Sequence, residues 1–133
     1  MKKDSLIVAV VIVIALALTS VGVTALVAPH FASAMFGVAA ADSSALVYIY
    51  ATGMRDVTIG CLLFALALHR AGRRILGATL MVLALIPIVD AIIVWMNAAK
   101  PSAVALALHI SGAIVFLALG FWLRLGRFPE PHR

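Results

Sequence analysis

Charged residues and cysteine are both scarce in this sequence. Only 11% of the 133 residues are Asp, Glu, Lys or Arg, whereas 65% are hydrophobic. A soluble domain has about a quarter charged and about half apolar residues, and at this length its interior is too small to hide so much apolar surface. The single cysteine, Cys61, excludes an intrachain disulfide and chemistry by paired thiols. The lipid bilayer is therefore the expected partner of most of the surface.

Four long apolar runs account for most of the chain. A helix needs roughly 20 apolar residues to cross a hydrocarbon core of about 30 Å, and runs of that length occupy residues 6–28, 45–68, 75–96 and 103–123. They lack the alternation of a membrane β-barrel strand. The short connections 69–74 and 97–102 require antiparallel neighbours. We expect an all-α membrane protein, one domain over residues 1–133 that forms a four-transmembrane-helix up-down bundle.

Basic residues gather on one side of these predicted spans. Of the ten, Arg55 lies inside a span and only Lys100 lies on the opposite side. The positive-inside rule then predicts an inner (plasma) membrane protein with both termini in the cytoplasm. Such residues contact phospholipid headgroups, so nucleic acid is not an expected partner. The eight on the predicted cytoplasmic side are Lys2, Lys3, Arg70, Arg73, Arg74, Arg124, Arg127 and Arg133.

The first apolar run also has features of a secretory signal. Basic residues precede it, and the small residues Val23, Thr24 and Ala25 resemble a cleavage site. Against this, the run continues to Ala28, which is longer than an h-region of about 7–15 residues. We expect a retained span, and cleavage would leave the other three orientations unchanged.

The first connection, residues 29–44, differs from the other two. It is longer, has no Lys or Arg, and includes Phe31, Met35, Phe36 and Val38. An apolar segment of this kind either anchors in the membrane interface or folds back over the mouth of the bundle.

Four ionisable residues lie within the predicted spans: Arg55 and Asp56 in the second, Asp90 in the third and His109 in the fourth. Each costs a few kcal/mol or more in the bilayer centre, so such groups face the interior and find partners. Counted along the helices, all four lie in the outer half of the membrane. We expect one buried polar network or ligand-binding cluster, in which Arg55 bridges Asp56 or Asp90 and His109 donates to the remaining carboxylate. Adjacent residues point about 100° apart, which favours the pairing with Asp90.

This cluster has two interpretations. It is either a buried ion-pair network that fixes helix register or a site in which a carboxylate and an imidazole act on a ligand. One interior His and two Asp lack the HxxxH or ExxH spacing of a metal site, so we expect no metal. Nor does any motif predict a cofactor, and the catalytic residues, if any, are not identified by the pattern.

Small residues suggest where helices pack closely. Gly53 and Gly60 are seven residues apart in the second predicted span, so they lie on nearly the same face and make a groove for a neighbouring helix. One expected occupant of this groove is a second copy of the chain, which would make a homodimer.

The polar positions and their surroundings resemble a known family, the small four-span membrane proteins grouped as domain of unknown function 4267 within the broader DoxX-like group. The matching segments are residues 53–60 (GMRDVTIG), residues 86–91 (IPIVDA), His109 with Gly112, the basic turn 70–74, and Phe36 with Gly37. The resemblance implies a four-helix DoxX-like bundle. It also implies that Arg55, Asp56, Asp90 and His109 belong to the family's signature, but it implies no activity.

Three functions are compatible with these patterns. The leading hypothesis is a protein that binds a small lipophilic ligand or a membrane partner through a polar pocket in the outer half. The alternative is a membrane enzyme, such as an isomerase, a cyclase or a quinone-linked accessory subunit, in which Asp90 and His109 transfer protons. The third is a small proton-coupled transporter, which would require a homodimer because four helices enclose little volume.

Overall fold

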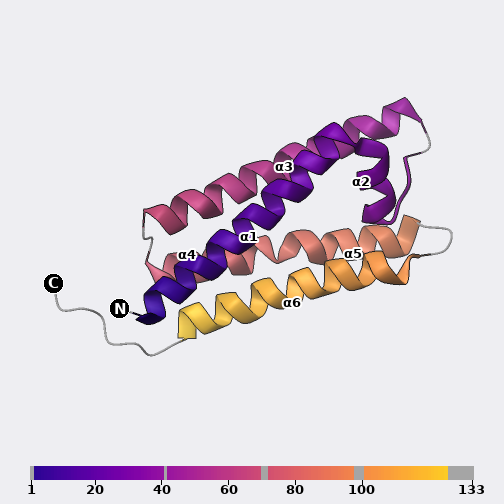
Figure 1. The fold of residues 1–133 in the computed structure, drawn as a ribbon. Coiled ribbons are helices and arrows are strands. Elements are labelled where there is room, and N and C mark those ends of the chain that lie inside the picture. The colour runs from indigo at the N-terminus through magenta and orange to yellow at the C-terminus, as the bar shows by residue number, and fades with distance from the viewer. Residues whose placement is uncertain (1, 41, 70–71, 98–100, 126–133) are drawn as a thin grey trace.

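The computed structural model describes residues 2–40, 42–69, 72–97 and 101–125, and within these ranges every regular element is a helix. Arg70, Lys100, Arg127 and Arg133, which entered the orientation prediction, lie outside the described residues. Figure 1 shows the helices as long rods that run beside one another, with one short helix at one end. In chain order the helices are α1 (Lys2–Val27), α2 (Pro29–Phe36), α3 (Ser43–Leu68), α4 (Arg73–Leu83), α5 (Leu85–Asn97) and α6 (Ala103–Leu125).

Four segments of the described chain are long and apolar enough to cross a membrane, which confirms the predicted all-α, four-span class. Their boundaries lie close to the predicted ones, because apolar length alone determines where a helix can sit in a bilayer. Large apolar side chains such as Val13 and Val82 are exposed on the flanks of the bundle, as lipid-facing residues are. The spans are Ser5–Val27, Ser43–Leu68, Arg73–Asn97 and Ala103–Arg124.

Local chemistry determines where several helices begin and break. The Asp42 side chain accepts a hydrogen bond from the Ala45 N–H at 2.9 Å and so caps the start of α3. Ser102 caps α6 in the same way, through the Ala105 N–H at 3.3 Å. The third span is broken at Ala84, between α4 and α5. Pro87 lies three residues later and has no N–H to donate to the preceding turn, which accounts for the break.

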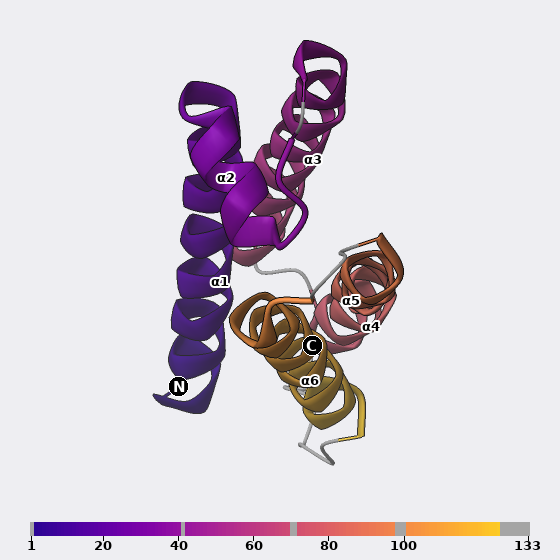
Figure 2. The same ribbon diagram turned by 90° about the vertical axis from the view of Figure 1, so that its right-hand side faces the viewer.

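The spans form two closely packed pairs, α1 with α3 and α4–α5 with α6, which Figure 2 shows side by side. Glycines allow the close approach in each pair. A Cβ at Gly53 would lie 2.9 Å from the Gly22 carbonyl oxygen, and a Cβ at Gly77 would lie 2.8 Å from the Gly120 carbonyl oxygen. Because lipid provides no hydrophobic force between helices, such close contact between backbones is the main source of attraction.

The predicted use of the Gly53 and Gly60 face for a homodimer is not supported. Both glycines are buried against α1 of the same chain, and a Cβ at Gly60 would lie 2.7 Å from the Ala15 carbonyl oxygen. The groove therefore receives the first span and is not available to a second copy.

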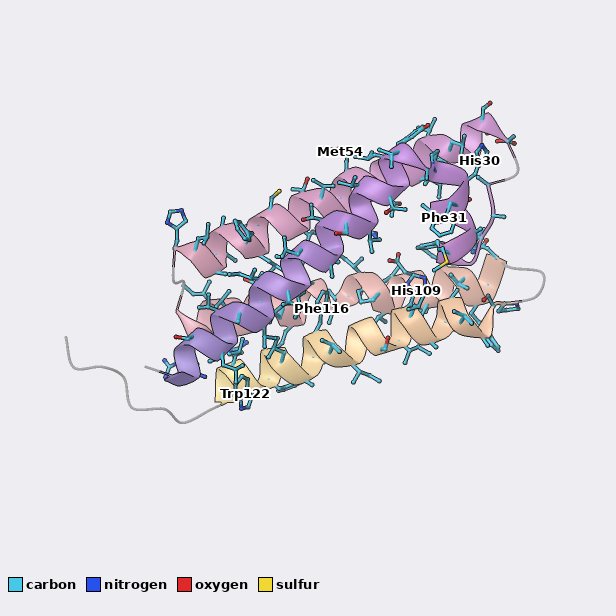
Figure 3. The ribbon with its side chains drawn as sticks, viewed as in Figure 1. His30, Phe31, Met54, His109, Phe116 and Trp122 are labelled. Carbon is cyan, nitrogen blue, oxygen red and sulfur yellow. The ribbon has the colours of Figure 1, made fainter. Side chains whose placement is uncertain are left out.

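One apolar core joins the two pairs, and it lies toward one end. We call the half that contains the start of α1, the end of α3, the start of α4 and the end of α6 the termini half. Its buried side chains come from all four spans and pack around Leu63, Leu80 and Phe116. Figure 3 shows Phe116 of α6 on the side of α6 that faces α1. The core members are Ile7, Val11, Ala15, Leu63, Ala67, Leu76, Leu80, Ala84, Phe116 and Leu123.

The opposite half, which contains α2 and the facing ends of α3, α5 and α6, is called the α2 half. Here α2 runs from the α1–α3 pair toward the α5–α6 pair (Figure 1). Gly37 ends α2 with a φ of 102°, which glycine adopts readily. A Cβ at Gly37 would lie 2.7 Å from the Ala105 Cβ and 3.0 Å from a Val94 methyl. The segment thus folds back onto the bundle, while Phe31 remains 60% exposed at its surface.

Candidate functional site

The charged cluster consists of Arg55 and Asp56 of α3 and Asp90 of α5, in the α2 half. Arg55 Nε donates to Asp56 Oδ1 at 3.0 Å, and Arg55 Nη2 donates to Asp90 Oδ2 at 3.3 Å. Both aspartates are buried, with 8% of each residue exposed, whereas 35% of the Arg55 side chain is exposed. One guanidinium therefore connects two buried carboxylates and keeps an accessible edge.

Arg55 contacts both carboxylates because its donors are separated along a long, forked side chain. The argument that neighbouring residues point apart favoured Asp90 over Asp56. It holds for the Cβ directions, but the Nε atom lies far enough from the backbone to reach Asp56 on the adjacent position. The Nη2 atom, farther out, crosses to α5. The structure thus brings Arg55, Asp56 and Asp90 together in a single contact set.

The Arg55–Asp90 ion pair links the two helix pairs. Helices α3 and α5 belong to different pairs, and their backbones make only sparse contact among the described residues. In the termini half the two helix pairs are joined by apolar packing. At the level of Asp90 they are joined by the ion pair between Arg55 and Asp90.

His109 of α6 lies in the same half but has a different partner from the one predicted. Its Nε2 atom is 3.1 Å from the Phe36 carbonyl oxygen, and its ring meets the Phe36 ring edge to face with centroids 4.8 Å apart. A carbonyl only accepts, so Nε2 carries the proton and donates. The prediction that His109 donates to a carboxylate is therefore wrong for the described contacts.

The contact with Phe36 makes α2 part of this site. Figure 3 shows His109 directed from α6 toward α2, whereas His30 lies at the start of α2, beside the α1–α3 pair. Ser33 of α2 is buried, donates to the His30 carbonyl at 2.8 Å and accepts from the Ala40 N–H at 3.2 Å, which holds the segment after α2 in place. Sequence reasoning missed the α2 helix. Its signal was present, since Pro29 stands at the first helical position and Gly37 directly after the last.

Two hollows of about 350 Å³ each lie on the apolar flanks and not at the cluster. One is lined by Leu62, Ala78, Thr79, Val82 and Leu83. The other lies along α1 and α3, around Thr19, Gly60, Cys61 and Phe64. Among the described residues, no three His, Cys, Asp or Glu side chains are grouped so that they could hold a metal ion. The cluster is thus a charged contact between helices and not the floor of either hollow.

The fold and this cluster define a helical membrane protein with four spans and a buried, partly accessible ion-pair network between two helix pairs. The chain belongs to the family described as Domain of unknown function (DUF4267), whose model matches residues 15–123. The match includes the whole cluster, His109 and α2. No curated protein and no solved structure matches the chain.

Proposed function

We propose that this protein binds a small lipophilic molecule with a polar head group, and that the head group contacts the charged cluster in the α2 half. The observation that carries the proposal is the arrangement of Arg55. Its guanidinium lies between two buried carboxylates, on helices that otherwise make sparse contact, and still exposes 35% of its side chain. A group that served only to fix the helices would be stronger if fully enclosed, because water and lipid headgroups weaken an accessible ion pair.

His109 and α2 support the same proposal. The imidazole and the Phe36 carbonyl place a polar contact beside the cluster, under a segment that covers this end of the bundle. A ligand that entered from the bilayer would meet the charged groups next to apolar helix flanks, the combination that binds amphipathic molecules. Ligand-binding residues in this proposal are Arg55, Asp56, Asp90 and His109.

Binding is preferred over catalysis because the described contacts direct Asp90 and His109 to different partners. The imidazole donates to Phe36, and Asp90 accepts from Arg55. A general acid and base must each reach the reacting atom within hydrogen-bond distance. A homodimeric transporter is also disfavoured, because the glycine face that was expected to mediate the dimer is filled by α1.

The test is native mass spectrometry of the protein extracted in a mild detergent. We expect a bound molecule of defined mass with the wild type and its loss in Asp90→Asn. Thr58→Val is the matched control, because Thr58 is exposed on α3 and bonds only to the Met54 carbonyl of its own helix. A bound mass that persists in Asp90→Asn, or that is absent from the wild type, would contradict ligand binding at the cluster.

Two finer points of identity are also proposals. We propose the inner (plasma) membrane, with both termini cytoplasmic, on the strength of the basic residues at the helix ends. In a Cys61→Ser background, an impermeant maleimide added to intact cells should label Ser44→Cys and not Gly72→Cys; the reverse pattern would mean that the orientation is inverted.

We also propose the wider DoxX-like grouping, on the sequence resemblance alone.

A further inference from the structure

The charge of the cluster does not balance. Away from the ends of the spans, the described membrane segments contain one arginine, Arg55, and two aspartates, Asp56 and Asp90. By the formal count, in which histidine carries no charge, the sum is one negative charge inside a low-dielectric region. Such a charge is costly in the bilayer unless a cation or a proton compensates it.

The hydrogen bonds show which carboxylate oxygens have no donor among the described residues. Each aspartate uses one carboxylate oxygen to accept from Arg55, namely Asp56 Oδ1 and Asp90 Oδ2. Asp56 Oδ2 and Asp90 Oδ1 accept no hydrogen bond from the described residues. A carboxylate can accept several hydrogen bonds, so two buried residues each retain an acceptor that has no donor within the described chain.

His109 does not supply the missing charge through an ion pair. Its Nε2–H donates to the Phe36 carbonyl, and no hydrogen bond joins the imidazole to either aspartate. Helices α1 and α2 also pack on α3; the α1 segment Ser5–Val27 contains no Asp, Glu, Lys or Arg, and His30 is the one ionisable residue of α2. The cations that could oppose the two carboxylates are therefore the Arg55 guanidinium and the imidazoles of His109 and His30, and only the guanidinium contacts a carboxylate among the described residues.

From this imbalance we propose that the head group bound at the cluster is cationic, a protonated lipophilic amine whose N–H groups donate to Asp56 Oδ2 and Asp90 Oδ1. The inference rests on the proposed ligand-binding function and names the ligand's chemical class. A lone buried arginine would attract an anionic head group. Here the guanidinium is already opposed by two carboxylates, so an anion would meet a site that is negative overall, whereas an ammonium brings the sum to zero.

The experiment compares three probes with the same twelve-carbon tail: dodecylamine, dodecanol and dodecanoate. At pH 7 the amine is protonated, as a lysine side chain is. Each probe is titrated into the wild-type protein in dodecyl maltoside, and the midpoint of thermal unfolding is recorded. We expect an apparent Kd for dodecylamine at least tenfold lower than for the other two, and we expect this preference to disappear in Asp90→Asn, whose cluster is neutral.

The outcomes separate the two levels of the proposal. Dodecanol or dodecanoate binding as tightly as dodecylamine, with a bound molecule seen in native mass spectra, would overturn the cationic head group and leave ligand binding standing. No effect from any probe, together with no co-purified mass, would overturn both. If Asp90→Asn does not fold, Asp56→Asn serves as the second neutral cluster, and the probe series on the wild type requires no variant.

Discussion

The two halves of the bundle are held together by different forces. In the termini half, ten apolar residues from all four spans form one buried cluster. In the α2 half, the two helix pairs meet through the Arg55–Asp90 ion pair and through α2, where Phe36 contacts His109 and Gly37 lies against the buried Val94 and Ala105. Both halves lie in the same bilayer, so the difference is not one of solvent.

The contrast indicates a division of roles. Apolar packing between helices in lipid is stabilised by many small van der Waals contacts, which a cavity would remove. Such packing suits a half that only holds the helices together. A charged contact costs more to bury and gains less, so we relate its presence to the ligand binding proposed above and not to stability. Changes in the termini half should therefore alter stability alone, and changes in the α2 half should alter binding as well.

The largest loss of stability is expected from Arg55→Gln. This change leaves Asp56 and Asp90 as two buried carboxylates with no cation, and breaking a buried pair in this way costs about 3–5 kcal/mol. Thermal unfolding in detergent measures the loss. Replacing all three charged residues with Gln, Asn and Asn should recover most of it, since no unpaired charge is left. A single Arg55→Gln variant as stable as the wild type would show that the ion pairs do not hold the α2 half together.

A slightly smaller loss is expected from Phe116→Ala in the termini half. Phe116 is buried in the core that joins all four spans, and truncating such a ring removes about 3 kcal/mol of packing. The same unfolding assay measures it. Because Phe116 does not contact the cluster, the mass of any bound ligand should be unchanged. Loss of the ligand in this variant would mean that the two halves are not separable.

The sequence was sufficient to predict the four spans, and three of the four polar residues that it grouped, Arg55, Asp56 and Asp90, contact one another. The span boundaries follow from the length of the apolar runs. The few ionisable residues within the spans were expected to lie together, because each would be costly to bury in the membrane without a partner. The partner of His109 could not be predicted in this way, because the position of the Phe36 carbonyl depends on how residues 29–44 fold. The sequence also could not predict that α1 packs against Gly53 and Gly60, because a face of small residues can receive a helix of the same chain or of another chain.

A smaller effect is expected from Gly60→Ala. Its new Cβ would lie 2.7 Å from the Ala15 backbone carbonyl, so α1 and α3 must move apart, and overpacking of this kind costs about 1–3 kcal/mol. Gly112→Ala is the matched control, because the nearest atom to its new Cβ is 3.6 Å away on Pro87. The midpoints of thermal unfolding of Gly60→Ala and Gly112→Ala measure the difference. Equal midpoints would contradict the close α1–α3 contact.

The smallest effect is expected at Asp42, outside the spans. A hydrogen bond from the Ser44 hydroxyl, and a second from the Ala45 N–H, lower the pKa of this carboxyl below its ordinary value of 3.8. The unfolded chain therefore binds the proton more readily, and the stabilisation is present above about pH 3.8 and lost as the pH falls through the folded-state pKa. The difference in unfolding midpoint between the wild type and Asp42→Ala should shrink below that pH. A constant difference would mean that the cap does not depend on the charge.

The most direct test of the division between the halves measures two quantities on the same samples: the bound mass in native spectra and the midpoint of thermal unfolding. The variants are Asp90→Asn in the α2 half and Phe116→Ala in the termini half. We predict that Asp90→Asn loses the bound mass but keeps a midpoint near that of the ligand-free wild type, because Arg55 stays paired with Asp56 and no uncompensated charge is left. We predict that Phe116→Ala keeps the bound mass with a lowered midpoint. If each variant lost the bound mass and also had a lowered midpoint, or if Asp90→Asn kept the ligand, the assignment of the ligand site to the α2 half would be contradicted.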